Sequence, residues 1–80
     1  MSKKKEKRSA VHRAVEQLIM EDYEVYIDRG IATFMDGAVG VDMESRLLFS
    51  ERPYHMEILP AFTPKVEIIA KIKELMLNAQ

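Results

Sequence analysis

The spacing of apolar residues changes twice along this 80-residue chain. From residue 10 to residue 22 apolar side chains recur every three or four positions, as on one side of a helix. From residue 23 to residue 58 they fall mainly on alternate positions, as on one side of a strand. Helical spacing returns from residue 64 to residue 78. The chain is therefore predicted to be an α+β fold, with an N-terminal helix, a sheet and a C-terminal helix.

The ends of both helices carry recognisable signals. Ser9 is a suitable N-cap for a first helix over residues 10–22, because its hydroxyl can accept a hydrogen bond from a free backbone N–H group. Thr63 and Pro64 suit the N-cap and the first residue of a second helix, where the missing N–H of proline costs nothing. We expect this second helix to run to about Asn78.

The middle of the chain predicts an antiparallel meander of three to five strands. Turns are expected at residues 28–30, at Asp36-Gly37 and at residues 51–53, where Gly, Asp and Pro interrupt the apolar runs. Both helices are expected to cover the apolar face of the sheet. That face is assigned to the odd positions from Val39 to Phe49, followed by Tyr54, Met56 and Ile58. The even positions between Val39 and Phe49, and Tyr26, are assigned to the wet face.

A competing interpretation follows from the same residues. The helical spacing of the first segment can be continued through Tyr23, Ile27 and Phe34, which would give one helix over residues 10–35. Such a helix would cross Gly30. The density of Val, Ile, Tyr and Phe, together with Gly30 and Asp36-Gly37, favours strands.

Charge divides the chain into a basic tail and an acidic body. Residues 1–8 carry five basic residues against Glu6, a net charge of +4, and are expected to form a flexible tail. Residues 9–80 carry seven basic and twelve acidic residues, a net charge of −5, and are expected to form one small domain. A body of that sign repels phosphate. With no cysteine and little length, the domain is expected to complete its burial by forming a homodimer.

The sequence shows neither a membrane-spanning segment nor a signal peptide. No apolar run approaches the length of about 20 residues that spans a bilayer. The basic N-terminus is followed by polar residues that interrupt any signal-peptide core. We therefore expect a cytoplasmic protein without a membrane partner.

The second helix suggests a contact surface. Its polar stripe is narrow, and apolar residues occupy most of the remaining circumference, so one sheet face cannot cover them all. The second apolar surface is expected to meet either the first helix or a partner chain. The leading hypothesis is a non-enzymatic regulator, adaptor or inhibitor that binds another protein, itself included. Its predicted partner-binding residues are Val66, Ile69, Ile72, Lys73, Met76 and Leu77, with Arg46 and His55 from the sheet.

Nucleic-acid binding is the alternative hypothesis. Basic arms contact phosphates without sequence preference and lose affinity as salt rises. The predicted contact residues are Lys3, Lys4, Lys5, Lys7 and Arg8. Gly37 and Gly40 have the Gly-x-x-Gly spacing of loops that approach phosphates, but Asp36 and Asp42 flank them. A hairpin turn and a close approach of the backbone explain these glycines better.

Metal-dependent catalysis is the weakest of the three functional hypotheses. Asp42 and Glu57 on neighbouring strands would give a degenerate metal-dependent nuclease-like site. The arrangement resembles the core of restriction-type nucleases, whose Glu-x-Lys motif would need lysine where Leu59 stands. His12 and His55 have no recognisable nucleophile motif beside them. We therefore predict no catalytic residue, no metal site and no cofactor.

Overall fold

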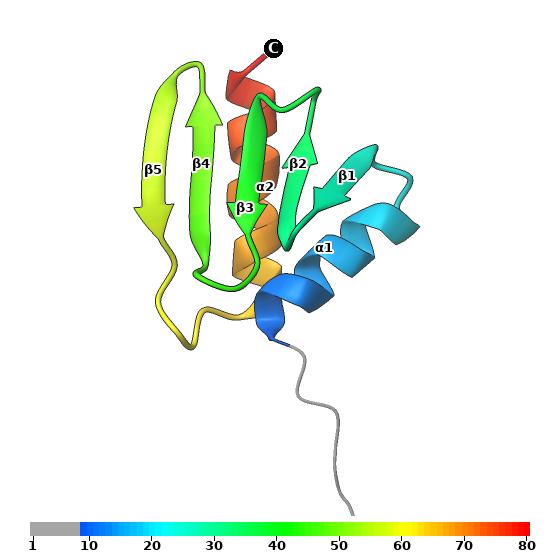
Figure 1. Cartoon of the computed structure of the whole chain (residues 1–80), viewed down its shortest axis with the longest axis vertical. Helices are drawn as coiled ribbons and strands as arrows, with labels where there is room; N and C mark the ends of the chain where they lie inside the picture. The colour runs from blue at the N-terminus through cyan, green and yellow to red at the C-terminus, as the bar shows by residue number, and fades with distance from the viewer. Residues whose placement is uncertain (1–8) are drawn as a thin grey trace, which may run out of the picture.

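The structure is a computed structural model that describes residues 9–80. It is an α+β fold, with one helix, five strands and a second helix in chain order (Figure 1). This confirms the predicted class and order of elements. The bounds are α1 Ala10–Met20, β1 Val25–Asp28, β2 Ile31–Phe34, β3 Val39–Asp42, β4 Leu47–Glu51, β5 Tyr54–Ile58 and α2 Lys65–Asn78.

Helix α1 begins and ends where local hydrogen bonds satisfy its backbone. The Ser9 hydroxyl accepts a hydrogen bond from the His12 N–H at 3.2 Å, which confirms the predicted N-cap. The helix ends two residues earlier than predicted, because Asp22 adopts a left-handed conformation with φ 72°. The Tyr23 N–H then reaches back to the Leu18 carbonyl at 3.0 Å, which closes a Schellman motif. Since β1 and β2 follow, the alternative of one helix over residues 10–35 is wrong.

The five strands form one antiparallel sheet in the order β1-β2-β3-β4-β5. The turn at residues 28–30 is confirmed: Arg29 and Gly30 join β1 to β2, and both have positive φ, as a type I′ turn requires. The next hairpin is also present, but its turn lies one residue earlier than predicted. Met35 and Asp36 are its central residues, and the Gly37 N–H bonds to the Phe34 carbonyl at 3.2 Å. Arg52 and a cis Pro53 join β4 to β5.

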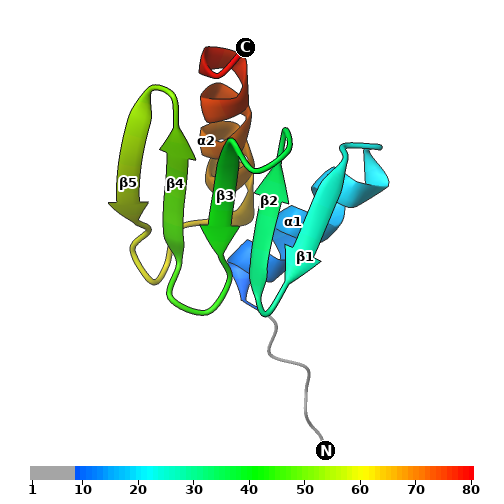
Figure 2. The same ribbon diagram turned by 45° about the horizontal axis from the view of Figure 1, so that its top comes forward.

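Both helices lie on the same face of the sheet, as predicted, and within residues 9–80 the opposite face has no helix (Figures 1 and 2). Helix α2 runs behind the central strands, while α1 lies beside it toward the β1 edge. Strand β5 forms the other edge, beyond α2. The core fills the space between the sheet and the helices, and its fully buried large side chains are Phe34, Leu18, Leu48, Leu59, Ile68, Ile72, Val11, Val15, Val39 and Val41.

Helix α2 begins one residue later than expected. Pro64 is extended and is the N-cap, and Lys65 is the first helical residue. Thr63 does not cap the helix, because its hydroxyl donates to the Pro60 carbonyl at 2.8 Å and holds the preceding turn. The predicted end at Asn78 is confirmed. Neither helix within residues 9–80 has the length and apolar character needed to cross a membrane.

Candidate functional site

The helix-free side of the sheet, here called the open face, is the surface that stands out in this fold. Its middle row runs Met56, Phe49, Gly40, Thr33, Tyr26 from β5 to β1, according to the strand register. The row beside it runs Ile58, Leu47, Asp42, Ile31, Asp28. Tyr54 and Glu51 are paired at the other end of β5 and β4. Most of these side chains are apolar, although the open face is in contact with water.

Several large side chains of the open face are well exposed. Tyr54 is 76% exposed, Ile58 67% and Met56 53%, and all three project from the same side of β5. Tyr26 on β1 is 68% exposed, in agreement with its predicted place on the wet face. Within residues 9–80, large side chains are therefore exposed on the open face at both edge strands, with half-buried Phe49 and Thr33 and buried Gly40 between them.

The predicted faces of β4 and β5 are wrong. The odd positions from Val39 to Phe49 were all expected to face inward, but a four-residue turn at residues 43–46 separates β3 from β4. Because Val41 pairs with Leu48, and Leu48 with Glu57, the inward side passes from odd positions in β3 to even positions in β4 and back to odd positions in β5. Phe49, Tyr54, Met56 and Ile58 consequently lie on the open face, and not in the core.

Gly40 and Phe49 pack against each other in the middle row of the open face. A Cβ atom built on Gly40 would lie 2.7 Å from Cε1 of Phe49, so the phenyl ring lies directly against the glycine backbone. This is the close approach that the Gly-x-x-Gly spacing predicted. Gly40 is buried under the ring, and Phe49 is half-buried. The pair gives the middle row of the open face a fixed aromatic centre.

The charged strand residues of the open face have one sign. Its strand residues include three carboxylates, at Asp28, Asp42 and Glu51, and none of the five strands contains Lys or Arg. Asp28 and Asp42 lie at one end of the sheet and Glu51 lies toward the other. The middle row is uncharged. This arrangement, with an apolar centre and charges at the margin, is typical of protein interfaces and unfavourable for phosphate.

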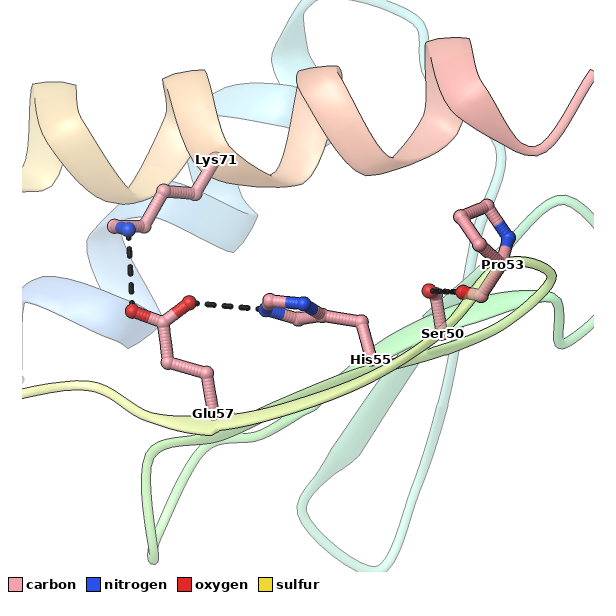
Figure 3. A network of polar contacts seen from close by, with 5 residues as sticks. All are labelled: Ser50, Pro53, His55, Glu57 and Lys71. Carbon is pink, nitrogen blue, oxygen red and sulfur yellow. Dashed lines mark hydrogen bonds and ion pairs between the residues drawn. The ribbon is translucent and has the colours of Figure 1, made fainter.

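On the helix side, β5 carries a polar network instead of core residues (Figure 3). Glu57 accepts a hydrogen bond from Lys71 Nζ of α2 at 3.1 Å, and its other carboxylate oxygen lies 3.1 Å from His55 Nε2. These side chains are about one third exposed, because β5 lies beyond the cover of α2. The hydrogen bond to His55 and then the one to Lys71 hold the pKa of Glu57 below its ordinary value.

The network near Ser50 does not form a nucleophile and base pair. The Ser50 hydroxyl donates to the Pro53 carbonyl at 2.6 Å, and His55 uses Nε2 for Glu57 (Figure 3). Nucleophilic catalysis would need the serine hydroxyl to donate to the histidine. These polar groups bind one another and tie β5 to α2 and to the β4–β5 turn.

The predicted contact surface on α2 is corrected in part. Ile69, Ile72 and Met76 are buried within the chain itself, in the core that α2 forms with α1 and the sheet. Val66 and Leu77 remain 71% and 67% exposed. Lys73 lies 3.4 Å from the Glu21 carboxylate and over the Tyr23 ring, so it links α2 to the end of α1. The first of the two predicted neighbours, the first helix, therefore covers the second apolar surface of α2.

The two predicted sheet residues do not join that surface either. Arg46 has φ 65° in the β3–β4 turn, and its Nε donates to the Leu59 carbonyl at 3.0 Å. His55 faces Glu57 at the β5 edge. The predicted nucleic-acid residues at positions 3–8 lie outside the described residues.

The carboxylates of the nuclease-like hypothesis lie apart. Asp42 is on the open face and Glu57 is on the helix face, so the two cannot share a cation. Asp42 Oδ1 accepts the backbone N–H groups of Glu44 at 2.9 Å and Ser45 at 3.3 Å, which lowers the pKa of Asp42. Among residues 9–80 no three His or carboxylate side chains gather as a metal site would require.

The sequence contained evidence that β4 and β5 need not follow the simple alternation, and it concerns the place of β5 in the sheet and the apolar run in β4. In a meander the last strand is an edge strand, and two helices are too narrow to cover five strands fully. Leu47, Leu48 and Phe49 are also consecutive apolar residues, so their own pattern favours neither face.

Comparisons with models of known protein families, with curated proteins and with solved structures found no match.

Proposed function

We propose that this chain is a small non-enzymatic domain that acts by binding protein, as a regulator, adaptor or inhibitor does, with the open face as its contact surface. The observation that carries the proposal is the joint exposure of Tyr54, Met56 and Ile58 on one side of β5. Adjacent apolar side chains of this size mark interaction sites on monomeric proteins.

Energetics supports this assignment. Burying one large apolar side chain is worth about 1.5–3 kcal/mol, and a small domain is stable by only about 5–15 kcal/mol in total. On β5 the apolar side faces water while His55 and Glu57 face the helix layer. A strand whose apolar side points away from the core departs from the usual pattern, and such departures concentrate at functional surfaces. A bound protein would recover the burial that folding leaves incomplete.

Photo-cross-linking in an extract of the native host tests the proposal. A benzophenone-bearing phenylalanine replaces Tyr54, and in a matched control it replaces Arg13, which is exposed on α1. We expect the probe at position 54 to give a covalent protein adduct that survives nuclease treatment, and the control to give none. Adducts from position 13 alone, or from neither position, would contradict a binding role for the open face.

Nucleic-acid binding through the tail is the second candidate, and the net charge of +4 over residues 1–8 favours it. In that case retention on duplex or single-stranded nucleic acid at low salt would disappear when residues 1–8 are deleted, and would fall steeply as salt rises. Absence of retention by the intact chain at low salt would reject this candidate.

The cytoplasmic location expected from the sequence stays a prediction.

A further inference from the structure

We infer that the partner of the open face is a second copy of this chain, packed sheet against sheet. The inference rests on the proposed function, because it names the occupant of the same surface. It moves the homodimer contact expected on α2, where Val66 and Leu77 are exposed, to the other side of the molecule, where Tyr26, Tyr54, Met56 and Ile58 are exposed on one face of the sheet.

The exposed area suits a homodimer. Tyr26, Tyr54, Met56 and Ile58 together leave on the order of 500 Å² of side-chain surface in water, at the exposed fractions given above. A stable interface buries about 800 Å² on each partner. Half-buried neighbours on the same face, including Leu47 and Phe49, add to the contact. One copy of the open face therefore supplies approximately what one side of a dimer needs.

The distribution of charge permits self-association. In each copy the middle row from Met56 to Tyr26 is uncharged, and the three carboxylates lie toward the ends of the sheet. The Asp42 carboxylate already accepts two backbone N–H groups. Two open faces can thus meet along their middle rows. Where the contact extends to Ile58 and Leu47 it also reaches Asp42 of the same row, whose two hydrogen bonds lower the cost of bringing this charge to the contact.

The position of Tyr26 distinguishes face contact from edge contact. Strand β5 is an edge strand, so edge contact would pair two copies through it and extend the sheet. Such pairing would leave Tyr26, on the opposite edge, 68% exposed. Face contact covers Tyr26 together with Tyr54, Met56 and Ile58. It is also the arrangement in which apolar sheet faces normally pack, about 10 Å apart.

Because the chain has no cysteine, an introduced thiol is unique. We place it by Thr33→Cys in the middle row, away from both edges, and by Arg13→Cys on α1 as the control. The reagent is a bis-maleimide with a reach of about 10 Å, the spacing of packed sheets. At equal micromolar concentrations Thr33→Cys should give at least about tenfold more cross-linked dimer than Arg13→Cys, a ratio that separates specific contact from random collision. Equal yields would overturn the inference.

Analytical ultracentrifugation of the purified full-length chain provides the second measurement. The mass should rise from one chain to two with concentration, and Ile58→Glu should return it to one, since a buried carboxylate opposes contact. Leu77→Glu on the exposed side of α2 should remain dimeric, and circular dichroism checks that both variants are folded. A wild-type chain that is monomeric at all concentrations overturns the inference. If position 54 then cross-links to a different protein, the proposed function survives; if it cross-links to none, both fail.

Discussion

At the scale of single residues, Gly40 and Phe49 show how a local motif acquires its meaning. Gly40 has no left-handed backbone, so conformational freedom does not explain it. The ring of Phe49 lies where a side chain at position 40 would stand. The glycine is therefore needed for space, and the Phe49 ring takes over the packing that a Cβ would have supplied.

Gly40→Ala should lower the free energy of unfolding by about 1–3 kcal/mol, because the added methyl group displaces the Phe49 ring. Urea denaturation measures this loss. In the background of Phe49→Ala the same substitution should cost at least about 0.5 kcal/mol less, since the two residues are in contact. Strictly additive losses would show that the ring does not lie against Gly40.

Glu57 is the residue whose protonation bears on stability. Its hydrogen bonds with His55 and Lys71 exist in the folded chain and hold its pKa below the ordinary value of 4.5. The folded state therefore binds this proton less readily than the unfolded state. The stabilisation is complete above the unfolded pKa and is lost as pH falls through the folded pKa.

Glu57→Gln should accordingly weaken the loss of stability on acidification below about pH 4.5. The difference between the free energies of unfolding of the wild type and the variant should shrink as pH falls through that range. Lys71→Met, which removes one of the two partners, should give an intermediate slope. Denaturation curves at several pH values check both, and parallel curves for wild type and Glu57→Gln would contradict the role of the network.

At the scale of elements, the helices and strands were largely predictable and their faces were not. Ser9 locates the start of α1 because a cap is a local interaction, and the prediction is correct. The faces of β4 and β5 depend on the lengths of two turns and on the pairing of Leu48 with Glu57, which no residue within either strand specifies. An error of one position in a turn reverses every side chain of the following strand.

Helix α2 shows the same limit. Its sequence predicts an apolar surface on more than one side, and it left open whether α1 or another chain covers the second side. Ile72 is fully buried and Leu77 is 67% exposed, although both are large aliphatic residues of the same helix. The sequence pattern of the helix does not distinguish them, and the packing of α2 against α1 and the sheet does.

Ile72→Val and Leu77→Val test this difference with matched products. Ile72→Val should cost about 0.5–1.5 kcal/mol in the free energy of unfolding, because it removes a buried methylene group. Leu77→Val should change it by no more than about 0.5 kcal/mol. Urea denaturation compares the two, and equal losses would mean that the Leu77 side of α2 is also covered in solution.

At the scale of the whole molecule, the open face combines apolar area with strand residues whose charges have one sign. Three carboxylates per copy and no strand Lys or Arg mean that self-association brings like charges nearer, while apolar burial drives it. A partner with a cationic surface would instead be attracted by these carboxylates. The effect of salt on binding therefore reports the nature of the partner.

We expect the dimer dissociation constant to fall as NaCl rises from about 0.1 M to about 1 M, because the screening length shortens from about 10 Å to about 3 Å. Asp28→Asn, which removes one of the open-face carboxylates, should reduce this dependence. Sedimentation at several salt concentrations measures it. A dissociation constant that rises with salt would point to attraction between opposite charges and would not fit contact between two open faces.

The sequence by itself determined the α+β class, the order of helix, antiparallel strands and helix, the cap of α1 and the turn at residues 28–30, because these follow from interactions between residues close in the chain. The tertiary structure decided which side of β4 and β5 the helices cover and what lies over α2. Those outcomes depend on contacts between distant segments. A period of two says that a strand has two different sides, but only pairing and packing decide which side meets the core.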